Sequence, residues 1–211
     1  DTLVVHLLRL ETNRATGWSA SLLAPYTADP TFLRYEASRD AKTATWQIDK
    51  QKGIAYMDPG EFKGPRIELP LRPMLGCIAT APARKAAIPT STPDDFGGNM
   101  DYNGMGAGAT LMLPVFEPGA LLFMGDGHAR QGDGEVLGSA IETSLDVEFS
   151  VDIIRRKKIN WPRLENQDFI MVLGSSRAIN EALQHATTEL MRWLMESYGY
   201  DERGASLLMG Q

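Results

Sequence analysis

The placement of proline and glycine is the feature that most restricts how this chain can fold. Proline lacks a backbone N–H and clashes with the preceding helical turn, so closely spaced prolines exclude long helices from residues 11–75. Glycine allows positive φ and close backbone approach, so residues 76–138 are expected to form tight turns between short strands. The prolines are Pro25, Pro30, Pro59, Pro65, Pro70 and Pro73, and the glycines include Gly97, Gly98, Gly104, Gly106, Gly108, Gly125, Gly127, Gly132 and Gly134.

Short strands are therefore the expected elements over most of the chain. Residues 2–10 are rich in β-branched and aliphatic side chains, and residues 144–153 alternate strictly between polar and apolar, as a half-exposed strand does. Residues 109–115, 120–124 and 168–173 are further strand candidates.

The spacing of hydrophobic residues changes from that of a strand to that of a helix only near the end of the chain. Apolar residues from Ile179 to Leu194 recur at helical spacing, with Ser175 or Ser176 as a cap and Gly199 as a stop. A second helix is expected over residues 202–209. These elements predict a mainly β (α+β) fold with a sandwich or barrel portion and one or two late C-terminal helices.

Composition, net charge and cysteine content exclude several classes of protein. The chain has 211 residues, 43% of them hydrophobic, and suits one domain over residues 1–211. A net charge of -6 argues against nucleic-acid binding, and no apolar run reaches the roughly 18 residues of a membrane span. The single cysteine, Cys77, excludes a disulfide framework and favours a reducing, cytoplasmic location.

Acid/base and metal-ligating groups are densest in the segment from Met124 to Glu135. Asp126 and His128 are two residues apart, so in an extended strand both side chains lie on one face. A carboxylate and an imidazole on one face can share a cation or a water. Glu142 is a further carboxylate that a return strand can bring alongside. The alternative is that these Asp, Gly and His residues simply form a turn.

Other candidate groups are more isolated. Asn99 and Asp101 follow two glycines, and Asp101 offers an oxygen ligand if that loop is not merely a turn. His6 lies within an apolar strand, where a histidine is more often structural than a ligand. Cys77 has apolar neighbours, which predict a buried, unreactive thiol.

Several of these segments together resemble the acetamidase/formamidase family. The segments are Gly76-Cys77-Ile78-Ala79, Gly97-Gly98-Asn99-Met100-Asp101, residues 113–121, Gly125-Asp126-Gly127-His128-Ala129 and Gln131-Gly132-Asp133-Gly134-Glu135. The resemblance implies a mainly β fold, hydrolysis of short linear amides such as formamide or acetamide, and a divalent metal. Because members of the family are longer, it also implies that segments before Asp1 and after Gln211 are absent from this sequence.

Side-chain chemistry on the matching motifs suggests a role for each residue. The metal is expected to be zinc or calcium, held first by Asp126 and His128 and more weakly by Asp101 and His6. Glu142 is expected to act as a base or ligand, and Asn99 and Gln131 to hold the amide of the substrate. Asp133 and Glu135 are expected to orient the histidine.

Two other functions remain open at this point. One is covalent amide hydrolysis through Cys77 or a serine, and the other is a metal-binding β-sandwich module, without catalytic activity, whose Gly-Asp-Gly-His loop is stiffened by calcium. The amidase interpretation further predicts a small amide substrate, a preference for short amides, and a homo-oligomer, most simply a dimer.

Overall fold

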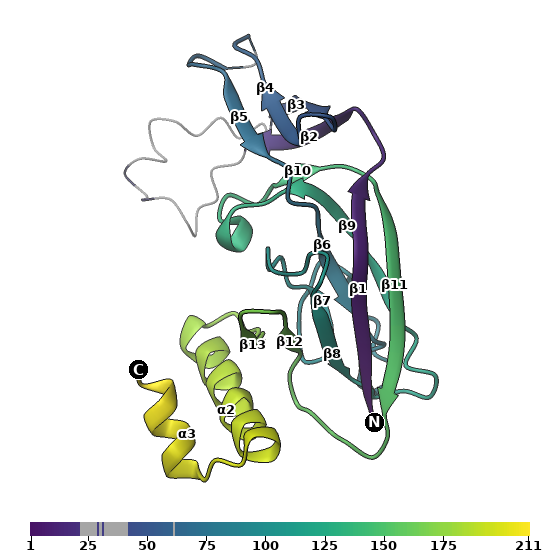
Figure 1. The fold of residues 1–211 in the computed structure, drawn as a ribbon, viewed down its shortest axis with the longest axis vertical. Helices are drawn as coiled ribbons and strands as arrows, with labels where there is room; N and C mark the ends of the chain where they lie inside the picture. Colours follow the sequence, from purple (N-terminus) through teal and green to yellow (C-terminus); the bar gives the residue numbers. More distant parts are fainter. Residues whose placement is uncertain (22–28, 30, 32–41, 61) are drawn as a thin grey trace.

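The computed structural model describes residues 1–21, 29, 31, 42–60 and 62–211 (Figure 1). Pro25 and Pro30, which contributed to the argument against helices, lie outside these residues. The described part is mainly β, with two helices at the end of the chain, as the sequence predicts.

One sheet has five strands in the order β11-β1-β8-β12-β13, and each neighbouring pair is antiparallel. The strands are β1 (Thr2–Thr12), β8 (Thr110–Pro114), β11 (Leu145–Ile154), β12 (Arg163–Glu165) and β13 (Ile170–Val172). The expected strands at residues 2–10, 109–115, 144–153 and 168–173 all belong to this sheet.

The second sheet has eight strands in the order β5-β4-β3-β2-β10-β9-β6-β7. Its strands are β2 (Thr16–Ser21), β3 (Lys42–Asp49), β4 (Ile54–Met57), β5 (Ile67–Pro70), β6 (Met74–Ala79), β7 (Gly97–Asn99), β9 (Phe123–Arg130) and β10 (Ile141–Glu142). Residues remote in sequence meet here, because β10 lies between β2 and β9.

The main hydrophobic core lies between the two sheets. Alternate residues of β1, among them Leu3, Val5 and Leu7, pack with Leu75 and Ile78 of β6. Burying these aliphatic side chains holds the sheets face to face as a sandwich. A smaller core around Trp46, Ile48 and Ile141 supports the β2–β5 end of the second sheet.

The strand expected at residues 120–124 begins later than the sequence suggests. Ala120 and Leu121 have φ values of 56° and 54°, which belong to a turn, and β9 starts only at Phe123. The strand then continues through Gly125, Asp126 and Gly127 to Arg130, so the candidate motif lies within a strand rather than after one. Its glycines obscured this, because glycine disfavours strands unless the backbone is closely packed.

Helix α2 (Ile179–Tyr198) follows the last strand and lies beside β13, and helix α3 (Glu202–Met209) packs against α2 on the side away from the sheet (Figure 1). Gly199 ends α2 with φ of 74°, as predicted. At the other end neither serine is the N-cap, because Ala178 occupies that position without a side-chain hydrogen bond.

The apolar stripe of α2 is buried only in part. Trp193 and Leu194 are buried, whereas Ile179 and Leu183 are 87% and 65% exposed. Two single-turn 3-10 helices, η1 (Ala83–Lys85) and η2 (Asp133–Glu135), complete the described elements.

Candidate metal and active site

A row of cross-strand neighbours places His128 beside a carboxylate. In the register of the second sheet, Glu142 of β10 pairs with Trp18 on one side and with His128 of β9 on the other, and His128 pairs with Met74 of β6. Directly paired residues lie on the same face of a sheet, so these side chains form one row. Asp126 lies two residues before His128, and its Oδ1 is 3.3 Å from His128 Nε2, although its φ of 62° differs from the extended geometry on which the prediction of a shared face rested.

The two nitrogens of the His128 ring have different surroundings. The residue is fully buried, and Nδ1 lies 2.8 Å from Gln131 Oε1 and 3.1 Å from Met74 Sδ. Nε2 lies 3.1 Å from Glu142 Oε2 and 3.3 Å from Asp126 Oδ1. These are ion-pair distances, yet neither oxygen lies where an N–H would point, so Nε2 has no hydrogen-bond partner among the described residues.

Asp101 reaches the same place from the loop after β7. Its backbone N–H donates to the Gly76 carbonyl, and its Oδ2 accepts a hydrogen bond of 2.6 Å from Asn99 Nδ2. Its Oδ1 is buried and has no hydrogen-bond partner in the part of the chain that the structure describes. A Cβ at Gly76 would be 2.5 Å from this oxygen and 2.3 Å from Asp126 Oδ2, so both carboxylates pack over the glycine backbone.

Glu135 also belongs to this cluster, whereas Asp133 does not. Potential ligand atoms of Asp101, His128 and Glu135 lie within 4.8 Å of one another, as do those of Asp126, His128 and Glu142. Asp133 is exposed and accepts a hydrogen bond from Asn103. Neither Asp133 nor Glu135 is hydrogen-bonded to His128 Nδ1, so the prediction that they orient the ring is wrong; Gln131 holds that position.

The crowding of acids changes the proton affinities in this cluster. Burial and the neighbouring carboxylates Glu135 and Asp126 raise the pKa of Asp101 to about 7. Burial opposes the charged form of His128, but Asp126 and Glu142 outweigh it and raise its pKa to about 10. The contact with His128 lowers the pKa of Asp126, while burial raises that of Glu135.

The donor set fits a divalent cation. Four carboxylates surround one imidazole, an excess of negative charge that a cation would balance. Ligand atoms at the corners of a tetrahedral zinc site are roughly 3.3–3.5 Å apart, since each lies 2.0–2.2 Å from the metal. The separations of 3.1 and 3.3 Å around Nε2 are close to that spacing. The unpartnered Nε2 and Asp101 Oδ1 are both directed into the cluster.

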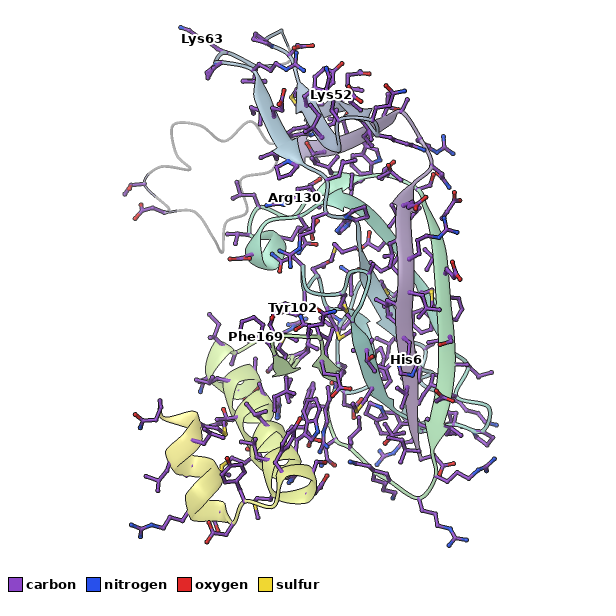
Figure 2. All side chains as sticks on the ribbon, in the orientation of Figure 1. His6, Lys52, Lys63, Tyr102, Arg130 and Phe169 are labelled. Atoms are coloured by element: carbon purple, nitrogen blue, oxygen red, sulfur yellow. The ribbon has the colours of Figure 1, made fainter. Side chains whose placement is uncertain are left out.

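His6 is not part of this site, so its proposed role as a weaker ligand is wrong. It lies on β1 of the other sheet, well apart from Arg130 at the end of β9 in Figure 2. Its Nδ1 is 3.0 Å from Thr110 Oγ1 and its Nε2 is 3.3 Å from Asp152 Oδ2. Because Val5 and Leu7 face the core, His6 faces outward from the sheet.

The two residues expected to hold substrate are already engaged with the protein. Gln131 is 3% exposed; its Oε1 faces His128 Nδ1 and its Nε2 donates to the Asp101 carbonyl. Asn99 donates to the Asp101 carboxylate. Both therefore support the cluster, and Gln131 has no polar atom free for a substrate.

A polar cleft of about 460 Å³ borders the cluster at Glu142. It lies on the β2 side of that residue, and its other lining residues are Arg14, Thr16, Gly17, Trp18, Thr45, Gly127, Thr143 and Ser144. Asp101 borders a different, largely apolar cleft of about 530 Å³ between its loop and α2. The first cleft offers hydroxyl groups beside a carboxylate of the cluster, which suits a small polar molecule.

Sequence reasoning missed Gly76 and Met74, and it gave Glu135 the role of orienting the histidine rather than that of a ligand. Gly76 lies within a segment that resembles the family, but its importance depends on Asp126, which packs over it from the neighbouring strand β9. No local pattern reports such a pairing, since the two residues are separated by 50 positions.

Comparison with known proteins identifies relatives of this chain. The Acetamidase/Formamidase family profile matches residues 83–211. An acetamidase from Mycolicibacterium smegmatis is 39% identical over 83 residues, which are 39% of this chain and 19% of that protein. A formamidase from Methylophilus methylotrophus is 35% identical over 86 residues, which are 39% of this chain and 21% of that protein.

Two solved structures extend the similarity over the whole chain. The acetamidase from Yersinia enterocolitica superposes with a TM-score of 0.84 and 29% identity, covering 100% of this chain and 62% of that one. The acetamidase from Bacillus halodurans gives a TM-score of 0.84 and 27% identity, covering 100% and 66%. The chain thus spans less than two thirds of the length of either solved relative.

Proposed function

Because the chain belongs to the acetamidase/formamidase family, we propose that it takes part in the hydrolysis of short linear amides, such as formamide and acetamide, with a divalent metal at the cluster around His128. The products are the carboxylate and ammonia. The observation that carries this proposal is the buried, unpartnered Nε2 of His128 between oxygens of Asp126 and Glu142.

Asp126 and His128 are the first-choice ligands, and Glu142 is either a further ligand or the base. His128 offers Nε2, Asp126 offers Oδ1 and Glu142 offers Oε2, while the unpartnered Oδ1 of Asp101 is available as a further donor. A bound divalent metal would polarise the amide carbonyl and lower the pKa of a bound water. The imidazole favours zinc or another transition metal, and the number of carboxylates leaves calcium as the alternative.

Carboxylates of the cluster can manage the protons of the reaction. Hydrolysis adds the oxygen of water to the carbonyl carbon, breaks the C–N bond and delivers a proton to the departing nitrogen. Glu142 borders the polar cleft and is placed to take the proton from water and return it to that nitrogen. Asp101, with a pKa raised to about 7, is a second group able to hold a proton near neutral pH.

The decisive experiment measures metal content and ammonia release together. We expect protein purified with bound metal to release ammonia from formamide and acetamide, and a chelator to abolish this release. His128→Ala and Asp126→Ala should each lose metal and activity while remaining folded. His6→Ala is the matched control, because His6 lies on the outer face of the other sheet. Normal metal content and ammonia release in His128→Ala would refute the assignment.

The same experiment separates the two alternative functions. A metal-binding module would retain the ion but release no ammonia from any amide. An enzyme that used the Cys77 thiol as its nucleophile would keep its activity in the presence of a chelator and lose it when the thiol is alkylated. The structure argues against the thiol, because Cys77 is 5% exposed and burial, reinforced by Asp126 and Asp101, raises its pKa to about 11.

We further expect the protein to act as a dimer in the cytoplasm. None of the described helices is long and apolar enough to cross a membrane. On β11, Phe149, Val151 and Ile153 are 42–49% exposed and form an apolar row on an edge strand, which supports self-association. Sedimentation of the purified protein and fractionation of the source cells test the two expectations.

A further inference from the structure

Gln131 connects the two parts of the candidate metal cluster. It directly follows β9, is 3% exposed, and makes two polar contacts through its side-chain amide. Oε1 lies 2.8 Å from Nδ1 of His128, and Nε2 donates to the backbone carbonyl of Asp101. One side chain therefore touches a ligand on β9 and the loop that carries another.

The carbonyl of Asp101 determines which way the amide of Gln131 faces. A backbone carbonyl can only accept hydrogen bonds, so the NH2 group of Gln131 must be directed at it. The amide oxygen is then directed at His128. Since that oxygen is only an acceptor, the hydrogen of their bond must be on Nδ1 of the imidazole.

A proton on Nδ1 leaves the lone pair of a neutral imidazole on Nε2. Nε2 is the nitrogen that lies 3.1 and 3.3 Å from the Glu142 and Asp126 oxygens without a hydrogen bond. The other neighbour of Nδ1, Met74 Sδ at 3.1 Å, is also only a weak acceptor. Both neighbours of Nδ1 are therefore acceptors, and both favour the tautomer that carries the hydrogen on Nδ1.

The second contact of Gln131 restrains the backbone of Asp101. Asp101 has φ of 44°, in the left-handed region that non-glycine residues adopt only when their surroundings hold them there. The hydrogen bonds from Gln131 to its carbonyl and from its own N–H to Gly76 hold this conformation. In this position, the buried Oδ1 of Asp101 is directed into the cluster.

We propose that Gln131 is a positioning residue of the metal site: it selects the Nδ1–H tautomer of His128 and holds Asp101, so that Nε2 and Oδ1 are presented together to a cation. This role rests on the proposed metal site. It replaces the substrate-binding role that the sequence suggested, and it makes Gln131 a determinant of metal affinity rather than a group that contacts the amide.

The test compares Gln131→Met with Gln47→Met in the full chain. Methionine keeps the length and packing of the side chain but removes the amide, and Gln47 is an exposed glutamine on β3 of the same sheet. For zinc binding, measured by competition with a chelator, we expect a roughly 10–100-fold loss of affinity in Gln131→Met. Gln47→Met should bind zinc as the wild type does.

The tautomer provides a readout that a purely structural role would not change. In the metal-free wild type, at a pH high enough for His128 to be neutral, imidazole ¹⁵N spectra should show the proton on Nδ1 and the lone pair on Nε2. Gln131→Glu retains an acceptor opposite Nδ1 but loses the donor to Asp101, so it should keep this pattern. In Gln131→Met the pattern should no longer be uniform.

The outcomes separate this proposal from the function on which it rests. If wild type and Gln131→Met bind zinc equally well with the same tautomer, the role of Gln131 is refuted and the metal site stands. A lower melting temperature of Gln131→Met without any change in affinity or tautomer also refutes it. If the wild type binds no divalent cation, the metal site itself fails, and the role of Gln131 fails with it.

Discussion

Gly76 controls the space available to the acidic side chains of the cluster. Asp126 and Asp101 both pack against its Cα, where a Cβ would be 2.3 and 2.5 Å from their oxygens. We expect Gly76→Ala to displace both carboxylates and to reduce zinc affinity by roughly 10–100-fold, the range seen when groups supporting a metal site are removed. Zinc titration of the purified variant measures this effect.

Gly125→Ala is the matched control for that substitution. Gly125 is also a strand glycine, on β9, but a Cβ there would meet no atom within 4 Å. Its zinc affinity should equal that of the wild type. Equal losses in the two variants would show that the effect comes from the strand backbone and not from the space above Gly76.

The thiol of Cys77 should be unreactive near neutral pH. Burial, with smaller contributions from Asp126 and Asp101, raises its pKa from 9.0 to about 11. At any pH well below 9 this shift of two units leaves about a hundredfold less thiolate, the reactive form, than an ordinary cysteine has. Iodoacetamide labelling of the folded protein should be slower by at least that factor than labelling in urea. It should accelerate as pH rises toward 11, and rapid labelling at pH 7.5 would contradict the shift.

At the scale of elements, a buried ion pair attaches helix α2 to the five-stranded sheet. Arg163 of β12 and Glu189 of α2 are both fully buried, and Arg163 Nη2 lies 2.6 Å from Glu189 Oε1. Trp193 of the same helix lies under the Arg163 guanidinium, 5.3 Å from ring centroid to Cζ. The contact is therefore concentrated in the C-terminal half of α2, where its apolar residues are buried.

Glu189→Ala should strongly destabilise the protein. It leaves the Arg163 charge buried, and among the described residues the partly exposed Glu196, 3.3 Å away, is then its one acidic partner. Losing one partner of a buried pair costs about 3–5 kcal/mol. Denaturant unfolding should show this loss, and metal content at low denaturant should be unchanged. Gln184→Ala, on an exposed part of the same helix, should change stability by less than about 0.5 kcal/mol.

At the scale of the whole molecule, the candidate metal cluster joins segments that are far apart in the chain. Asp101 comes from the loop after β7, Asp126 and His128 from β9, Glu135 from η2 and Glu142 from β10. A cation bound by these residues would stabilise the folded state alone, since the unfolded chain does not bring them together.

Metal should therefore raise the stability of the folded protein. At a free zinc concentration about 1,000 times Kd, we expect the free energy of unfolding to increase by about 4 kcal/mol over chelator-treated protein. His128→Ala should show no such increase at the same zinc concentration. Identical unfolding curves of the wild type with zinc and with chelator would contradict a site built from these segments.

Local sequence determined several features of this protein. The strand character of residues 2–10 and 144–153 and the helical period ending at Gly199 both follow from backbone geometry over a few residues. Local sequence predicted the wrong boundary where glycine or turn residues interrupt the strand pattern, as at the start of β9. It also failed on α2, where periodicity defines an apolar face but not the neighbour that buries it, so Ile179 and Leu183 remain exposed.

Only the tertiary structure decided which residues form the candidate site. The register between β9 and β10 brings Glu142 to His128, and the pairing of β6 with β9 places Gly76 beneath Asp126. The same arrangement excludes His6, whose strand belongs to the other sheet. The physical reason is that strand register is set by packing of the whole core, which sums contacts between distant residues, whereas the face of a side chain depends only on its immediate backbone.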